Sequence, residues 1–337
     1  MLYESQLADR GRPAFLALTP MDGTPPARIT AKPAIRCSHP AVTRSHHTGV
    51  AKLCMNVSWT IDINNIPDDV LALIFEACCS QNQKIHPWRR APLVLLRVCR
   101  RWNSLALQLP SIWAQIHPHF MHPASIDLWL QRSQNQDLSL YSSLIHPLDD
   151  TVLASRRMDA FKRFMQEVHR WKSLDFTLGI VQASMLINVL QNNVASRLSI
   201  LALNIADCPD QVSTLAQLVS ERCPNLSVLD LTSPQADAEV FAQFPIDRVN
   251  ELTLHGRFLF ASKVFMILEK CTKARQISIC GINVGPAREY DRPPIVLDCL
   301  HSLALDCLRS PVALISKLRI PNIKHPKVVV EEFGVTR

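Results

Sequence analysis

A regular pattern of apolar and polar positions begins just after Pro67. Four apolar residues then recur at spacings of three and four, namely Leu71, Ile74, Phe75 and Cys78. This spacing places their side chains on one face of a helix. Pro67 and the two aspartates after it suit the start of a helix, because proline has no amide hydrogen to leave unpaired and carboxylates favour the positive end of the helix dipole. Such a helix has to bury its apolar face.

A second helical pattern runs from about Pro92 to Leu109 and ends at Pro110, because proline cannot continue a helix. Its apolar face carries Leu95, Val98, Cys99, Trp102, Leu105 and Ala106, and its polar face carries Arg97, Arg100, Arg101 and Asn103. A segment of about fifty residues makes a poor independent core, since it buries too little surface to offset chain entropy. The extra apolar surface favours a binding partner. The alternative is that its aromatic residues pack on one another or on the next domain.

Further along the chain, the pattern becomes a repeat of the form apolar-x-x-apolar-x-apolar, which occurs six times. The middle residues stand at positions 174, 201, 229, 252, 277 and 303, so the steps are 27, 28, 23, 25 and 26 residues. Helical patterns fill the intervals, an alternation that is typical of leucine-rich repeats. One unit cannot bury both its strand face and its helix face, whereas stacked units share a core. The spacing therefore predicts an α/β solenoid.

Residues that alternate with the buried ones in each predicted strand point to the opposite face of the sheet. In the six strands these outward residues include four carboxylates and no Lys or Arg. We expect a mildly acidic face with a small apolar patch at Ile200 and Val228. The candidate substrate-binding residues on this face are Asp175, Ile200, Val228, Asp230, Glu251, His255 and Asp306.

The segment from Gly285 to Pro294 contains three prolines, so it cannot form a regular helix. It is a second candidate for a partner contact. A surface insertion that the fold tolerates is the alternative interpretation.

The helical part of the chain resembles an F-box. The residues that carry this resemblance, in order, are Ile66, Pro67, Leu71, Ile74, Phe75, Val98, Cys99, Trp102, Ala106, Leu109 and Trp113. All but Ile66 are the expected adaptor-binding residues, because in that family three short helices dock onto a Skp-type adaptor that leads to a cullin-RING ubiquitin ligase. The stretch from Ser80 to Ala91 is longer than the connection in compact F-boxes.

With the repeats, the whole chain resembles fungal-type F-box proteins with C-terminal leucine-rich repeats. The expected fold class is α+β, in which a small all-α F-box helical domain precedes an α/β leucine-rich-repeat solenoid. The expected domains are a disordered N-terminal tail at 1–58, the F-box domain at 59–116 and the substrate-binding repeats at 117–337. Residues 1–58 lack sustained periodicity and are rich in Pro, Ala, Thr, Ser and His.

Composition places the chain among globular proteins, because 47% of its 337 residues are hydrophobic. No apolar run is long enough to span a bilayer, and the N-terminus lacks a secretory pattern. Its eleven cysteines are scattered, which favours buried free thiols over disulfides. We expect an intracellular protein of the cytoplasm and/or nucleus, with no membrane partner.

The net charge of +7 invites a nucleic-acid hypothesis, so its location matters. Residues 1–60 carry +4, residues 61–112 carry +2 and residues 113–337 carry only +1. A long phosphate-binding surface concentrates its excess of Lys and Arg in the binding domain. The large C-terminal part is nearly neutral, so a nucleic-acid partner is disfavoured.

Catalytic and metal sites find little support in the sequence. His117, His119 and His122 are close together, but a closed zinc site needs four ligands and no cysteine or carboxylate lies beside them. The eight glycines form no phosphate loop or dinucleotide fingerprint. We expect no cofactor, no metal and no enzymatic activity.

The sequence thus predicts a substrate-recognition subunit of an SCF-type ubiquitin ligase. The segment from 66 to 113 is expected to bind the Skp-type adaptor, and the repeats are expected to bind a protein substrate. The alternative is a leucine-rich-repeat interaction scaffold that is not coupled to ubiquitination. Co-purification with an adaptor distinguishes the two.

Overall fold

The computed structural model describes residues 63–81, 91–117, 123–142, 151–205, 209–234, 238–283, 293–307 and 312–330. Contacts between residues divide the chain into two units, Met1–Thr60 and Ile61–Arg337. All described residues belong to the second unit. The predicted disordered tail at 1–58 lies outside the described residues.

The N-terminal part of this unit is helical. Its elements are η1 (Ile63–Asn65), α1 (Asp68–Gln81), α2 (Ala91–Leu95), α3 (Arg100–Leu107) and η4 (Pro110–Trp113). Two aspartates occupy the first turn of α1, where carboxylates are favourable. Cys99 caps α3, because its Sγ accepts a hydrogen bond from the Trp102 backbone N–H at 3.5 Å.

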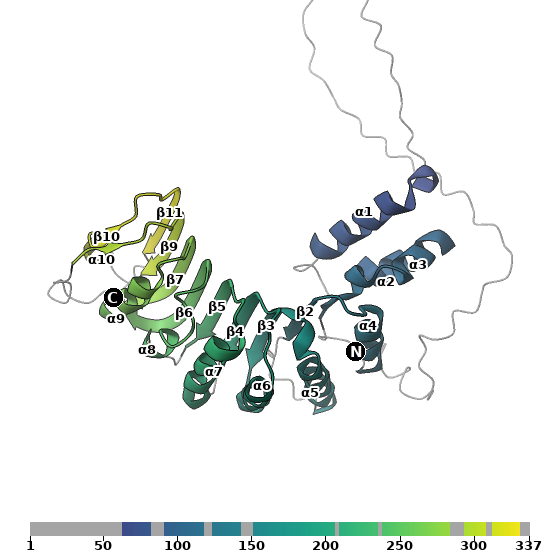
Figure 1. The fold of residues 1–337 in the computed structure, drawn as a ribbon, viewed down its shortest axis with the longest axis horizontal. Coiled ribbons are helices and arrows are strands. Elements are labelled where there is room, and N and C mark those ends of the chain that lie inside the picture. The colour runs from purple at the N-terminus through teal and green to yellow at the C-terminus, as the bar shows by residue number, and fades with distance from the viewer. Residues whose placement is uncertain are drawn as a thin grey trace, which may run out of the picture. The chain divides into compact units, whose positions relative to one another are not determined.

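One large sheet dominates the rest of the unit (Figure 1). Its nine strands, in spatial order, are β1 (Gln115–Ile116), β2 (Leu138–Ser142), β3 (Trp171–Leu178), β4 (Ile200–Ile205), β5 (Val228–Ser233), β6 (Glu251–Phe260), β7 (Gln276–Asn283), β9 (Ser302–Cys307) and β11 (His325–Val330). All eight pairings are parallel. A second, two-stranded parallel sheet pairs β10 (Leu318–Arg319) with β8 (Ile295–Val296).

Helices connect these strands and pack along one side of the large sheet (Figure 1). They are α4 (Pro123–Arg132), α5 (Thr151–Gln166), α6 (Ile180–Asn192), α7 (Pro209–Arg222), α8 (Ala238–Phe241), α9 (Ala261–Lys270) and α10 (Val312–Ile315), with η6 (Val168–Arg170) between α5 and β3. No described helix covers the opposite side, which we call the open sheet face.

The repeat spacing corresponds to strand register. The six middle residues of the sequence repeats pair directly across adjacent strands, in the order Leu174, Leu201, Leu229, Leu252, Ile277 and Leu303. All six are buried. A backbone ladder precedes the strands, in which the amide of Asn250 donates to the Ser227 carbonyl at 2.7 Å and the amide of Arg275 donates to the Asn250 carbonyl at 2.7 Å. Each unit is therefore fastened to the one before it.

The expected α+β fold class, with a small all-α F-box domain and a leucine-rich-repeat solenoid, is wrong. The structure is an α/β fold built on one large parallel sheet. Strand β1 follows η4 directly and pairs with β2, so the helical segment continues into the sheet. Trp113 is fully buried, and its ring meets that of Trp129 edge-on at 5.2 Å. Local periodicity did not reveal this shared core, because it says nothing about which neighbour buries an apolar face.

Candidate protein-interaction surfaces

Helix α1 is apolar on two faces, and the structure buries only one of them. Leu71 and Phe75 are 1% and 0% exposed. On the other face Val70, Leu73 and Ile74 stand at helical spacing, and Leu73 is 66% exposed. A helix that is apolar nearly all round is expected to be buried all round, so the second face of α1 suits a partner.

Exposed aliphatic side chains also occur on α2 and in the turn before α3. Leu93 and Val94 lie on α2, and Val98 lies in the turn before α3. We call the six residues Val70, Leu73, Ile74, Leu93, Val94 and Val98 the helical apolar surface. Isolated exposed leucines and valines are ordinary, but several on one short helical segment indicate a protein-protein contact.

Polar contacts fix the relative positions of the helical elements. Arg101 on α3 forms an ion pair with Asp68 on α1 at 2.6 Å. The Ser111 hydroxyl donates to Glu76 Oε1 at 2.6 Å and so joins η4 to α1. The Asn103 amide donates to the Leu96 carbonyl at 2.9 Å. These contacts hold the exposed aliphatic residues in fixed positions.

The ten residues predicted to bind an adaptor fall into three groups. Those exposed are Pro67, Ile74, Val98 and Cys99, those half-buried are Trp102 and Leu109, and those buried in the core are Leu71, Phe75, Ala106 and Trp113. Trp102 packs on Phe75 with ring centroids 4.9 Å apart. The exposed Val70, Leu73, Leu93 and Val94 were not among the predicted residues. The second apolar face of α1, visible in the sequence pattern, could have indicated Val70 and Leu73.

The predicted substrate-binding residues all lie on strands, at positions that alternate with buried ones. Asp175, Ile200 and Glu251 are exposed, and Val228, Asp230, His255 and Asp306 are half-buried. They belong to β3, β4, β5, β6 and β9, so the structure brings them onto the open sheet face. Strand β11 adds Lys327 to this face, since Lys327 pairs with the outward-facing Ala304. The expected lack of Lys and Arg therefore does not extend to β11.

Carboxylates on the open sheet face are crowded by neighbouring strands. Loss of hydration raises the pKa of Asp175 above its ordinary value, and the nearby Asp230 raises it further. Loss of hydration also raises the pKa of Asp230, which the neighbouring His255 partly offsets. Within the described residues neither carboxylate forms an ion pair or a hydrogen bond. One buried oxygen of Asp306 also has no hydrogen-bond partner there.

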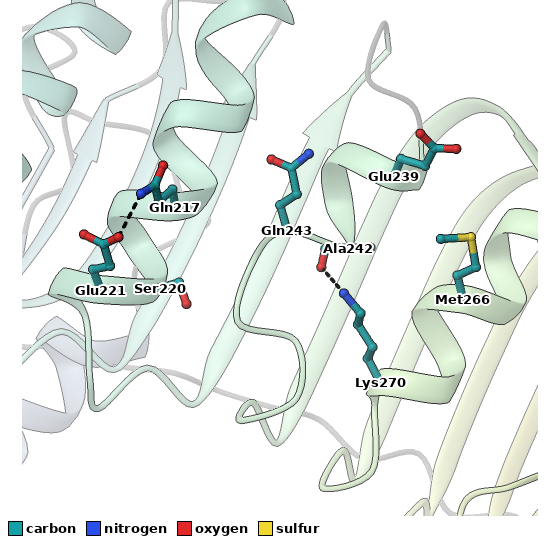
Figure 2. A pocket seen from close by; sticks show the side chains of 8 residues that line it. All are labelled: Gln217, Ser220, Glu221, Glu239, Ala242, Gln243, Met266 and Lys270. Carbon is teal, nitrogen blue, oxygen red and sulfur yellow. Dashed lines mark hydrogen bonds between the residues drawn. The ribbon is translucent and has the colours of Figure 1, made fainter.

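The helix side carries a shallow cavity of about 530 Å³, shown in Figure 2. It arises where α8 is a single turn between the longer α7 and α9. Its lining residues are Gln217, Ser220, Glu221, Glu239, Ala242, Gln243, Met266 and Lys270. Several of their polar groups bind one another, since Lys270 donates to the Ala242 carbonyl at 2.8 Å and Gln217 donates to Glu221 at 2.9 Å.

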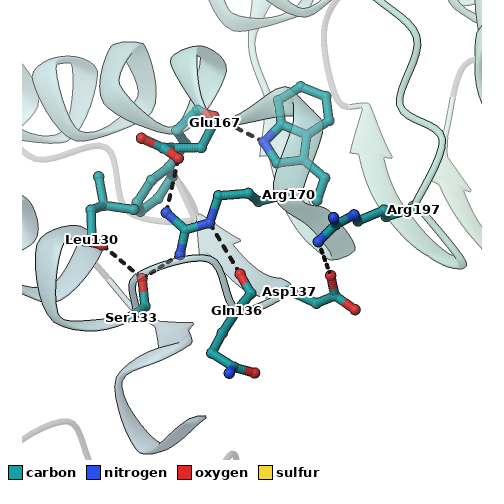
Figure 3. Close-up of polar contacts among 9 residues, drawn as sticks. Leu130, Ser133, Gln136, Asp137, Glu167, Arg170 and Arg197 are labelled. Atoms are coloured by element: carbon teal, nitrogen blue, oxygen red, sulfur yellow. Dashed lines mark hydrogen bonds and ion pairs between the residues drawn. The ribbon is translucent and has the colours of Figure 1, made fainter. Parts of the chain in front are cut away.

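A buried arginine organises the start of β3 (Figure 3). Arg170 is buried and donates to Glu167, to the Gln136 carbonyl and to the Ser133 hydroxyl at 3.0, 3.1 and 2.6 Å. Nearby, Arg197 forms an ion pair with Asp137 at 2.9 Å. All these partners are structural, so the cluster fastens the turn before β2 to the strands that follow it.

The sequence also drew attention to the cysteines, to three histidines and to a proline-rich segment. Cys223, Cys271 and Cys307 are buried free thiols, whereas Cys78, Cys99 and Cys299 are exposed. Among the described residues, no group of three or more His, Cys, Asp or Glu could hold a metal ion. The histidines at 119 and 122 and most of the Gly285 to Pro294 segment lie outside the described residues.

Every helix in the described part of the chain is too short or too polar to span a bilayer. Comparison with known proteins adds no family. The chain matches no protein-family model, and no curated protein matches it.

Proposed function

We propose that this protein is a substrate receptor of an SCF-type ubiquitin ligase inside the cell. In this proposal the helical segment binds a Skp-type adaptor, and the open sheet face binds a protein substrate. The adaptor and the ligase bound to it carry out the catalytic steps, so this chain needs no cofactor. The F-box resemblance of residues 66 to 113 supports the first role.

One observation carries the proposal: the helical segment exposes aliphatic side chains in addition to those that it contributes to the shared core. Leu73 is 66% exposed and Val98 is 52% exposed, whereas Leu71 and Phe75 of the same segment are buried. Covering such residues stabilises a complex by about 25 cal/mol for each Å² of apolar surface removed from water. We therefore assign adaptor binding to the helical apolar surface with Pro67 and Cys99, and assign a supporting role to Leu71, Phe75, Ala106 and Trp113.

A scaffold that is not coupled to ubiquitination is the second candidate. The burial of Trp113 against Trp129 favours it, because that tryptophan serves the chain's own core. Four of the ten predicted anchors are buried in the same way. The two candidates differ in a single measurable property, which is binding to the adaptor.

Co-expression with a Skp-type adaptor and affinity purification tests the proposal. We expect a stable complex with the wild-type chain and at least roughly tenfold weaker binding for Leu73→Asp with Ile74→Asp, because a buried unpaired charge costs several kcal/mol. Val181→Asp is the matched control, since Val181 is an exposed aliphatic residue of α6. A folded wild-type chain that does not bind the adaptor rejects the ligase role and leaves the scaffold.

A further inference from the structure

Five side chains form one row across the first five strands of the open sheet face. Tyr141 on β2 pairs with Asp175 on β3, Asp175 pairs with Ala202 on β4, and Ala202 pairs with Asp230 on β5. His117 follows β1 and stacks on Tyr141. We call these residues, His117, Tyr141, Asp175, Ala202 and Asp230, the acidic row.

The row has an aromatic end. The rings of His117 and Tyr141 are 3.9 Å apart and nearly parallel, with 9° between their planes. Tyr141 pairs with Asp175 on the next strand, so the aromatic end of the row lies beside a carboxylate. An aromatic face attracts cations, and it attracts the flat guanidinium group most readily.

The centre of the row is a gap between two carboxylates. Asp175 and Asp230 lie two strands apart, which corresponds to roughly 10 Å between their backbones. The residue between them is Ala202, whose methyl group fills little of that space. Two residues before Ala202 and Asp230 on the same strands, Ile200 is 38% exposed and pairs with the half-buried Val228. A flat cation fits between the carboxylates, and an aliphatic side chain fits on Ile200 and Val228.

Charge on this part of the face is unbalanced. Asp175 and Asp230 repel each other, and no described Lys or Arg forms an ion pair with either. His255 on β6 is a neighbour of Asp230, and Lys327 lies four strands beyond β5. A bound cation removes the repulsion and forms charge-assisted hydrogen bonds with both carboxylates. A phosphate backbone meets the wrong sign of charge here.

We propose that the acidic row binds an extended, arginine-containing segment of a protein partner. The guanidinium lies over Ala202 between Asp175 and Asp230, and a neighbouring aliphatic residue of the segment packs on Ile200 and Val228. Arginine is favoured over lysine because its planar fork donates to two carboxylates at once. The inference rests on the proposed function only in naming the segment as part of a substrate, because the binding itself does not require the adaptor.

Panning a random peptide library displayed on phage against the purified full chain tests this inference. We expect the enriched peptides to carry an arginine next to an aliphatic residue, and we expect Asp175→Asn with Asp230→Asn to enrich none of them. An enriched peptide, made synthetically with a fluorescent label, then gives a Kd by anisotropy. Replacing its arginine by citrulline, which has the same shape and no charge, should weaken binding at least about tenfold.

Matched variants separate this site from general electrostatics. Asp247→Asn with Asp298→Asn removes the same charge from exposed turns outside the sheet, and it should leave the Kd within about twofold. Peptides without a basic residue, failure of the wild-type chain to enrich any peptide, or equal binding by the double Asp175/Asp230 variant overturns the inference. Adaptor binding is measured separately with the Leu73 and Ile74 variant, so failure of the ligase role and failure of the arginine site are distinguishable.

Discussion

Trp113 and Trp171 make the same hydrogen bond in two different parts of the chain. Each indole Nε1–H donates at 2.9 Å to the carbonyl seven residues earlier, which belongs to Ala106 in one case and to Phe164 in the other. Each tryptophan lies where a helix and a 3-10 turn lead into a strand of the large sheet: Trp113 is the last residue of η4, and Trp171 is the first residue of β3. Helix α3, η4 and β1 are thus built like α5, η6 and β3, so the helical segment supplies the first unit of the sheet.

This equivalence predicts that the helical segment and the sheet unfold together. Trp113→Ala should lower the free energy of unfolding by about 3–5 kcal/mol, because it leaves a cavity beside Trp129. Trp113→Phe keeps most of the packing, so its cost should be smaller. Urea unfolding followed by circular dichroism measures both. Two separate transitions, of which the variant shifts only one, contradict a shared core.

Some of this architecture could be predicted from sequence and some could not. Steps of 23 to 28 residues correctly placed Leu201 and Leu229 in register, because parallel strands in a stack repeat a fixed local pattern. The burial of Leu71 rather than Leu73 could not be predicted. Both faces of α1 are apolar, and only the tertiary contacts decide which face packs inside. Likewise, a sequence pattern could not show that Trp113 joins the core of the sheet.

The two faces of α1 should respond differently to the same substitution. Leu71→Ala should cost about 2–5 kcal/mol of stability, because Leu71 is 1% exposed. Leu73→Ala should change stability by less than about 0.5 kcal/mol, because that side chain is exposed. Thermal unfolding compares the two, and adaptor pull-down at a temperature where both are folded should show loss of binding for Leu73→Ala only. Equal destabilisation by both changes would exclude this orientation of α1.

Loss of hydration at Asp175 and Asp230, together with charge repulsion at Asp175, predicts a pH-dependent stability. The pKa values of Asp175 and Asp230 are raised above the ordinary 3.8, so the folded state binds more protons than the unfolded state in that range. The folded state therefore gains stability as the pH falls through the raised pKa values. It loses that stability as the pH rises toward 7. The groups facing these carboxylates are Tyr141 on β2 and His255 on β6.

Asp175→Asn with Asp230→Asn should thus be more stable than the wild-type chain at pH 7. Its advantage should shrink as the pH falls toward 3.8, where the wild-type carboxyls become neutral. Urea unfolding at several pH values measures the difference. Asp247→Asn with Asp298→Asn provides the control for net charge. A gain that is independent of pH would show that folding does not raise the pKa of either carboxyl.

The last strand of the sheet predicts self-association of the chain. Strand β11 stands at the end of the strand order and pairs only with β9 among the described strands, so its other edge offers backbone groups to a further strand. Val328 and Val329 are both exposed there. We expect light scattering to show concentration-dependent association of the wild-type chain. Val328→Lys with Val329→Lys should reduce it, since lysines on an edge strand oppose pairing.

Ile180→Lys with Val181→Lys, on exposed positions of α6, should leave association unchanged. A monodisperse monomer at every concentration, for the wild type and both variants, excludes association through this edge.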